Sequence, residues 1–302
     1  MSALAAEPPI PIIDTHIHLF DPTRPQGVPW PDKVKQPSLY QPALPARYRK
    51  IAAPLGVKGA IEVEASPWLE DNQWVLDVAA ADPIIVGTIG NLEPGAPDFP
   101  RQFERFTKNP LFRGIRYGNL WDRSLAAGLE KPAFIAGLKR LADANLTLDT
   151  ANPNPDLIAT IVRLTDRVPN LRIVLDHLPS LVIPADAAAA RDYRAHLAEL
   201  GRRSSVYVKL SAVYRRTNGE VPRDLARYRA TLDELVAVFG EDRVVYGSDW
   251  PNSDQLRPYP DILALVQEYF ASKPRAVREK YFWKNSVAAY RWIHRDPSQP
   301  SA

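Results

Sequence analysis

The sequence predicts a single α/β domain built as a (β/α)₈ barrel. Short β-branched runs alternate with longer stretches in which apolar residues recur at three- and four-residue spacing, as in strands followed by amphipathic helices. The number of strand-like runs, eight, is that of a closed parallel barrel. An open, doubly wound sheet is the alternative. No GxGxxG turn follows the first strand, which weakens the dinucleotide-binding version of that fold.

The predicted elements follow one another from residue 12 to residue 293, the bounds of the predicted domain. The strands are Ile12–Leu19, Gly59–Ala65, Ile84–Asn91, Arg113–Gly118, Leu146–Ala151, Arg172–Leu178, Val206–Ala212 and Val244–Asp249. The clearest helical segments are residues 70–82, 131–145, 154–168, 187–203 and 223–240. Residues 1–11 form an N-terminal extension, and residues 294–302 form a tail that we expect to fray.

A proline-rich insertion, residues 21–44, follows the first strand. It reads DPTRPQGVPWPDKVKQPSLYQPAL. A loop of this length is usually functional or mobile. At the C-terminal end of the first strand it either covers an active site or is a structural excursion, and the sequence leaves both open.

The composition limits the class of function. The formal net charge is +3 and no block of like charge occurs, so we expect neither a nucleic-acid partner nor a membrane surface. The chain has no cysteine, which excludes disulfides and thiolate chemistry and fits a reducing compartment. The start lacks a signal-like pattern, and no apolar run reaches membrane-spanning length. We therefore expect a cytoplasmic protein with a small-molecule substrate, and a homo-oligomer is left open.

The first strand carries the strongest chemical signal. In IIDTHIHLF, residues 12–20, strict alternation puts Asp14, His16 and His18 on one side and Ile13, Thr15, Ile17 and Leu19 on the other. We expect the first set in the barrel lumen and the second against the helices. Two imidazoles two residues apart on one face suit one metal ion or one polarised oxygen. Two buried structural histidines are the alternative.

Other predicted strands also place polar residues at or near their C-terminal ends. Burying this many polar groups without a function would be costly, which favours a functional constellation at the mouth of the barrel. The residues concerned are Glu62, Glu64, Arg116, Asp149, Asp176, His177, Lys209, Ser211 and Asp249.

Several of these residues are candidates for substrate contact. The planar fork of Arg116 suits a carboxylate or a hydroxyl, although an ion pair with Glu62 or Glu64 is an equal alternative. Trp250 is expected at the mouth or in packing, and Lys209 either meets the substrate or makes an ion pair inside the barrel. The predicted substrate-binding set is Arg116, Glu64, Tyr117, Asp149, Lys209, Trp250 and Asn252.

Three segments in order, DTHIHLF (14–20), LDHLP (175–179) and YGSDWP (246–251), resemble the amidohydrolase superfamily in its amidohydrolase-related (type 2) branch. FRGIRYG (112–118) and VYVKLSAVY (206–214) resemble the fourth and seventh strands of its sugar-lactone and pyrone-dicarboxylate lactonases. The resemblance spans residues 12–292. It implies an amidohydrolase-type barrel and the hydrolysis of a cyclic ester, as in carbohydrate or aromatic catabolism.

The resemblance also implies roles for individual residues. His16, His18, His177 and Asp249 match the metal-ligand positions of the superfamily, and Asp249 is expected to be the general base. Other members bridge two metals with a lysine or glutamate on strand four and use a histidine on strand five, where this chain has Arg116 and Asp149. The chain is therefore expected to hold one divalent ion, with Zn²⁺ first, or to act without metal.

Three other activities are compatible with the same residues. A nonoxidative decarboxylase of the same branch shares the histidines and the late aspartate. A lactone isomerase would replace water by intramolecular attack. A non-catalytic carbohydrate-binding barrel would not need a base, so the presence of Asp249 argues against it.

Overall fold

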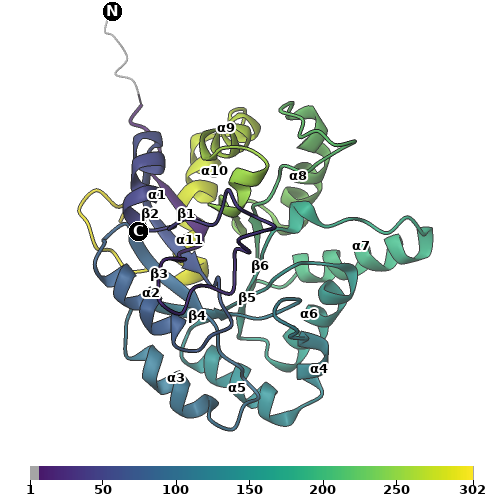
Figure 1. The fold of residues 1–302 in the computed structure, drawn as a ribbon. Helices are drawn as coiled ribbons and strands as arrows, with labels where there is room; N and C mark the ends of the chain where they lie inside the picture. Colours follow the sequence, from purple (N-terminus) through teal and green to yellow (C-terminus); the bar gives the residue numbers. More distant parts are fainter. Residues whose placement is uncertain (1–6, 302) are drawn as a thin grey trace, which may run out of the picture.

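Eight parallel strands form a nearly closed barrel in the computed structural model, which describes residues 7–301 (Figure 1). The strands pair in chain order, so the predicted (β/α)₈ barrel is confirmed. All eight predicted strands are present. They are β1 (Ile12–Ile17), β2 (Val57–Val63), β3 (Ile85–Gly90), β4 (Phe112–Arg116), β5 (Thr147–Asp149), β6 (Arg172–Leu175), β7 (Val206–Leu210) and β8 (Val244–Tyr246).

Helices surround the strands. Proline in the first turn starts α1, α3, α5, α6 and α9, where its missing N–H costs no hydrogen bond. Asn154 and Asp186 cap α6 and α7 with their side chains. The helices are α1 (Pro45–Ala52), α2 (Asp71–Ala80), α3 (Phe99–Thr107), α4 (Leu125–Leu129), α5 (Pro132–Asp143), α6 (Pro155–Arg167), α7 (Ala187–Gly201), α8 (Ala226–Phe239), α9 (Tyr259–Phe270), α10 (Arg275–Glu279) and α11 (Asn285–Tyr290).

The seam between β1 and β8 closes the barrel. The His18 N–H donates to the carbonyl of Trp250 at 2.8 Å, and the Asp249 N–H donates to the carbonyl of His16 at 2.9 Å. These bonds lie just beyond the last residue of β8. The barrel is therefore closed by backbone groups of His16, His18 and Asp249, three predicted site residues, and of Trp250, which follows Asp249.

A register shift in β1 overturns one prediction. Asp14 does not share a face with the two histidines: its Oδ2 accepts from the hydroxyls of Tyr48 on α1 (2.9 Å) and Tyr259 on α9 (3.1 Å). The pairing of β1 with β2 is irregular between Asp14 and Ile17, so three steps on β1 match two on β2. The extra residue turns Asp14 toward the helices and leaves the histidines inside.

Apolar side chains fill the interior beneath the histidines. Ile13, expected against the helices, belongs to this cluster. The cluster joins residues of β1, β2 and β3 to residues of β6, β7 and β8 and to aromatic residues near the C-terminus. Its buried members are Ile13, Ile61, Val63, Val86, Ile89, Val174, Tyr207, Val245, Trp283, Ala289, Tyr290 and Trp292. This plug leaves polar chemistry to the C-terminal half of the barrel.

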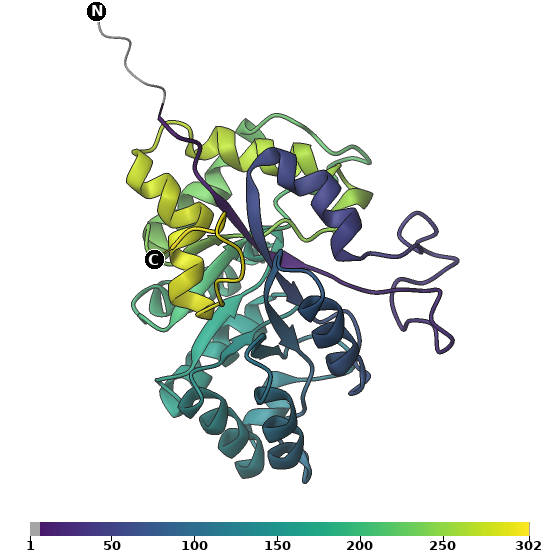
Figure 2. The ribbon, with the colours of Figure 1, turned by 90° about the vertical axis from the view of Figure 1, so that its left-hand side faces the viewer.

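The proline-rich insertion lies over the strand ends. Its trace extends away from the C-terminal end of β1 (Figure 2) and crosses in front of the strands in the view of Figure 1. The backbone of Phe20 pairs with that of Ala43, which closes the base of the insertion. Trp30 inside it contacts the ring of His18, with ring centroids 5.4 Å apart. The insertion thus covers the site, the first of the two alternatives left open.

The C-terminal tail is bound rather than frayed, against expectation. The Arg295 guanidinium donates to the carbonyls of Ala79, Asp82 and Ile85 at 2.6–3.0 Å. Residues 1–6 of the predicted N-terminal extension lie outside the described residues. In the described part of the chain, no helix has the length and apolarity needed to cross a membrane.

Candidate active site

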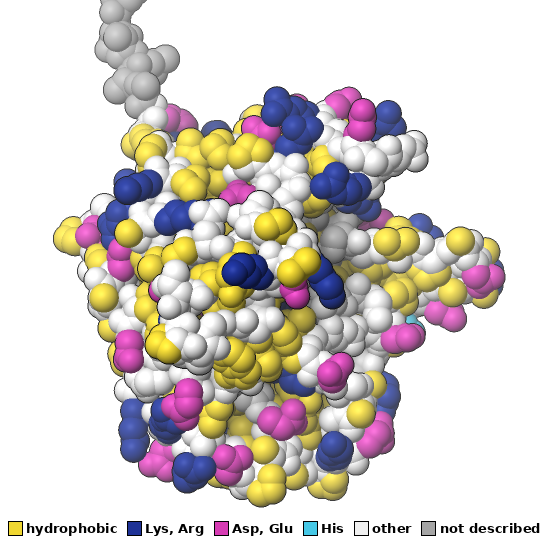
Figure 3. Space-filling model, viewed as in Figure 1, with side chains coloured by type: hydrophobic (Ala, Val, Ile, Leu, Met, Phe, Trp, Pro, Cys, Tyr) yellow, Lys and Arg dark blue, Asp and Glu magenta, His cyan; other side chains and the backbone are white. Residues whose placement is uncertain are grey.

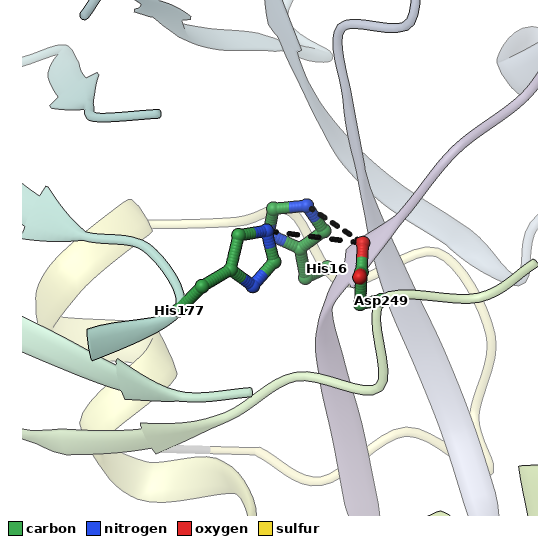
Figure 4. A group of neighbouring side chains, drawn as sticks. All are labelled: His16, His177 and Asp249. Carbon is green, nitrogen blue, oxygen red and sulfur yellow. Dashed lines mark ion pairs between the residues drawn. The ribbon is translucent and has the colours of Figure 1, made fainter. Parts of the chain in front are cut away.

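Three imidazoles converge on one carboxylate oxygen. Asp249 Oδ1 lies 3.2 Å from His18 Nε2, 3.6 Å from His16 Nε2 and 3.8 Å from His177 Nε2. Figure 4 shows His16 and His177 approaching Asp249 from different strands. The convergence expected from the sequence is therefore present, although the residues lie up to 233 positions apart in the chain.

Strained backbone conformations hold two of the four groups. His177 comes two residues after the end of β6, and Asp249 comes three residues after the end of β8. Both have left-handed backbone angles, with φ of 56° and 63°. This region is costly for residues other than glycine and clusters at functional sites. The sharp turn after each strand points the side chain back over the barrel mouth. The carbonyl of Asp249 also accepts from the Ser253 N–H at 2.8 Å.

Hydrogen-bond partners determine which nitrogen carries the proton in two of the histidines. His18 Nδ1 lies 2.8 Å from the carbonyl of Val63, which can only accept, so this nitrogen donates. His177 Nδ1 lies 2.8 Å from Ser211 Oγ, and its Nε2 lies 3.4 Å from a nitrogen of Arg116, which can only donate. Nε2 of His177 therefore offers a lone pair to the site, whereas Nε2 of His18 lies 3.2 Å from Asp249 Oδ1, a carboxylate oxygen that can only accept.

His16 has the opposite arrangement. Its Nδ1 lies 3.2 Å from Lys209 Nζ, an ammonium with donors only. The ring then accepts at Nδ1 and carries its proton on Nε2, facing His18 Nε2 (3.3 Å) and the Asp249 carboxylate. Asp176 Oδ2, 3.6 Å from the same Nδ1, is the competing acceptor for a proton at that position.

A buried ionic network lies directly under the histidines. Lys209 Nζ is 2.9 Å from Asp149 and 2.8 Å from Asp176, and Arg116 is 3.1 Å from Asp176. Tyr290 donates its hydroxyl to Asp149 at 2.7 Å. Lys209 and both aspartates are fully buried, so each charge needs its partner. Asp149 and Lys209, predicted to bind substrate, belong to this network instead.

The electrostatics favour neutral imidazoles beside an ionised aspartate. Burial opposes ionisation of Asp249, but the neighbouring imidazoles outweigh it and hold the pKa of Asp249 below its usual range. Burial lowers the pKa of His177 to about 4, partly countered by Asp249. Burial and the Lys209 ammonium also lower the pKa of His16. At neutral pH the Asp249 carboxylate therefore lies beside uncharged rings of His16 and His177.

A cavity of about 190 Å³ opens above this cluster. Its lining consists of His18, Trp30, Glu64, Ala65, Arg116, Leu120, Trp121, Asn152, His177, Asp249 and Asn252. Asn252 donates to Asp249 Oδ2 at 2.8 Å and so orients the carboxylate. Little histidine surface is visible on the face seen in Figure 3, in keeping with the burial of His16, His18 and His177.

Besides Asp149 and Lys209, two further predicted substrate-binding residues are not brought to the cavity. Tyr117 packs on Phe134 of α5 and donates its hydroxyl to Glu93 at 2.9 Å. Trp250 is fully buried against Tyr48 of α1. Each lies next to a residue of the site, and alternation turns it to the helix side of the barrel.

The sequence did not single out four residues of the lining, Trp30, Ala65, Leu120 and Asn152, nor the position of Arg123. Trp30 comes from the proline-rich insertion, whose path no periodicity specifies. Asn152 has a left-handed φ of 49° just after β5, a conformation that asparagine tolerates. An asparagine directly after a predicted strand was therefore a sequence signal for this position. Arg123 forms an ion pair with Glu64.

The donor set fits a divalent metal ion. His16, His177 and Asp249 each offer one ligand atom, and these atoms lie within 4.8 Å of one another. Imidazole and carboxylate together suit divalent transition metals. The Nε2 lone pair of His177 is available, whereas ligation by His16 requires its proton to move from Nε2 to Nδ1, toward Asp176.

Comparisons with known proteins agree with this geometry. The amidohydrolase family model matches residues 13–292. An L-fucono-1,5-lactonase of Burkholderia ambifaria is 27% identical over 241 residues, which cover 80% of each chain. An L-fucono-1,5-lactonase of Burkholderia multivorans is 25% identical over 285 residues, 91% of this chain and 94% of the relative. A crystal structure of a Burkholderia multivorans amidohydrolase with bound zinc superposes with a TM-score of 0.80 at 22% identity, covering 94% of this chain and all of that one.

Proposed function

The chain belongs to the amidohydrolase family, and from this premise we propose that it is a hydrolase that opens a lactone ring with water. The observation that supports this best is the single carboxylate oxygen of Asp249, shared by three imidazoles at the wall of a cavity of small-molecule size. The similarity to two L-fucono-1,5-lactonases supports a lactone as the substrate.

In the proposed reaction, Asp249 is the general base. Its low pKa keeps it ionised at neutral pH, and Asn252 fixes Oδ2 so that Oδ1 is the basic atom. Asp249 takes a proton from water as the water oxygen attacks the lactone carbonyl carbon. The bond from this carbon to the ring oxygen then breaks, and Asp249 returns the proton to the leaving oxygen.

The developing oxyanion needs a positive partner. A metal-free route through protonated imidazoles, expected from the sequence, is disfavoured because burial lowers the pKa of His16 and His177. Arg116 lines the cavity and its guanidinium lies 3.4 Å from His177 Nε2. We assign Arg116 the stabilisation of the oxyanion in the absence of metal.

Zn²⁺ is the proposed metal where one is bound, since imidazole and carboxylate ligands are those it prefers. His16, His18, His177 and Asp249 would hold it. A bound ion supplies Lewis acidity at the carbonyl and lowers the pKa of water. A cytoplasmic location and a homo-oligomer remain predictions from the sequence.

The test is the variant Asp249→Asn, assayed with a pH indicator on sugar and dicarboxylate lactones. We expect a fall in kcat of about 10²–10⁴-fold, the usual contribution of a general base, with an unchanged circular dichroism spectrum. Asp242→Asn is the control, because Asp242 is an exposed acid that pairs with Lys280. Full activity in Asp249→Asn, or release of carbon dioxide in place of acid from an opened lactone, would refute the proposal.

A further inference from the structure

The two arginines next to the catalytic cavity are already neutralised inside the protein. Arg116 pairs with Asp176 at 3.1 Å. Arg123 donates from one nitrogen to Glu64 and from the others to the carbonyls of Leu120 and Arg116, both at 3.2 Å. Every nitrogen of the Arg123 guanidinium thus has a partner, and each of the two arginines already has a carboxylate of the protein beside it.

Glu64 is the residue that holds Arg123 in this state. It follows β2, lines the catalytic cavity and is only 4% exposed. One oxygen accepts from Arg123, while Oε2 has no hydrogen-bond partner within residues 7–301. A buried carboxylate oxygen without a donor is costly, and a substrate hydroxyl is a donor of the right kind.

The rest of the lining suits an uncharged, hydroxylated ring. Asp249 and Glu64 are the two acids of the lining, whereas Arg116 is the one Lys or Arg among the described lining residues. Trp30 and Trp121 offer aromatic faces, and Asn252 offers an amide. A substrate carboxylate would meet two acids and no unpaired cation, which costs binding energy.

We propose that Glu64 is a specificity-determining residue: it accepts a hydrogen bond from a substrate hydroxyl, keeps Arg123 occupied, and thereby selects neutral sugar lactones over lactones that bear a carboxylate. This inference rests on the proposed lactone hydrolysis and deepens it. Replacing Glu64 by glutamine removes an acid from the cavity wall and leaves Arg123 without its carboxyl partner. Arg123 then becomes available to a substrate carboxylate.

The experiment compares substrates that differ at one carbon. D-Glucono- and D-galactonolactone are paired with D-glucaro- and D-galactarolactone, in which a carboxylate replaces the terminal CH₂OH. We expect wild type to favour the neutral member in kcat/KM by at least tenfold. In Glu64→Gln we expect this ratio to move at least tenfold toward the carboxylated member, chiefly through KM.

Two further variants separate the causes. Glu93→Gln is the matched control. Glu93 follows β3, accepts a hydrogen bond from Tyr117 and does not line the catalytic cavity. The ratio of kcat/KM for neutral to carboxylated lactones should equal that of wild type in this variant. Glu64→Gln combined with Arg123→Gln should lose the gain on carboxylated lactones. If Glu64→Gln does not fold, Arg123→Gln alone tests the idea, since an unpaired Glu64 should disfavour the carboxylated lactone further.

The failures of the two proposals are distinguishable. If wild type opens lactones but Glu64→Gln leaves the ratio unchanged, the selective role of Glu64 is wrong and lactone hydrolysis stands. A wild-type preference for carboxylated lactones also overturns it, and would assign selection to Arg215 and Arg216 in an adjoining hollow that shares Asp249 and Asn252. If wild type opens no lactone, the proposed function falls and this inference falls with it.

Discussion

At the scale of single residues, the proton on His16 decides how the cluster works. Lys209 lies within hydrogen-bond distance of Nδ1, so His16 donates from Nε2 toward Asp249, whereas His177 accepts at Nε2 from Arg116. His18 places its Nε2 3.2 Å from the Asp249 carboxylate and donates from Nδ1 to the carbonyl of Val63. A metal ligated by all three rings needs His16 in the other tautomer.

We therefore predict that, in metal-free protein, His16 carries its proton on Nε2 and His18 on Nδ1. Nitrogen NMR of ¹⁵N-histidine-labelled protein distinguishes the two tautomers by their ring shifts. His294 is an internal reference, because its Nε2 faces the carbonyl of Gln299 at 3.1 Å and must donate. A proton on Nδ1 of His16 would mean that Asp176, not Lys209, orients the ring.

The sequence predicted the site at this scale only in part. Residue types and their spacing were enough to assemble His16, His18, His177 and Asp249, because each sits at or just after a strand end. Pairing partners were not predictable from the residues alone. Asp149 and Lys209 carry charges that suit a substrate equally well, and only three-dimensional proximity shows that they neutralise each other.

At the scale of elements, the strands were predictable and their faces were not fully so. Alternation holds only while the register with the neighbouring strand is unbroken. The irregular pairing of β1 with β2 moves Asp14 to the helix side, where Tyr48 and Tyr259 satisfy it. No pattern in IIDTHIHLF marks the extra residue, since Asp14 and Thr15 are equally acceptable on either face.

The proline-rich insertion is the element with the clearest functional consequence. Its Trp30 lines the cavity and makes edge contacts with the rings of His18 and Phe20, at 5.4 and 5.2 Å. We predict that Trp30→Ala raises KM for a lactone about fivefold, because one aromatic contact contributes about 1 kcal/mol. Steady-state kinetics test this.

Trp68→Ala is the matched control for that measurement. Trp68 is 39% exposed and does not line the catalytic cavity, so its removal should leave KM unchanged. Equal effects of the two substitutions would show that the insertion acts on stability rather than on substrate. A large fall in kcat for Trp30→Ala alone would instead assign Trp30 to the orientation of His18.

At the scale of the whole molecule, closure of the barrel and assembly of the site are one event. The backbone bonds between residues 16–18 and residues 249–250 both join β1 to the segment after β8 and set the distance between the histidines and Asp249. The barrel class was predictable because eight strand-like runs are a property of the entire chain. The seam was not, since it depends on contacts more than 230 residues apart.

The C-terminal tail makes similar long-range contacts at the opposite end of the barrel. Arg295 donates to carbonyls at the end of α2 and at the start of β3, including Ala79, Asp82 and Ile85, and Gln299 donates to Lys58 and Pro83. The carbonyls that Arg295 binds lie in the last turn of α2, in the loop after it and at the start of β3, and those of Ala79 and Asp82 also accept backbone N–H groups. A cation at a helix C-terminus is also favoured by the helix dipole.

We therefore predict that Arg295→Ala lowers the free energy of unfolding by about 2 kcal/mol, the scale of losing charge-assisted hydrogen bonds at a partly buried site. Urea denaturation followed by circular dichroism measures it. Arg101→Ala is the control, because Arg101 makes an exposed ion pair within α3 and should change stability by less than about 0.5 kcal/mol. Since the tail lies at the N-terminal ends of β2 and β3, away from the histidines, kcat of the folded variant should stay at the wild-type value. A loss of kcat without a loss of stability would show that the two ends of the barrel are coupled.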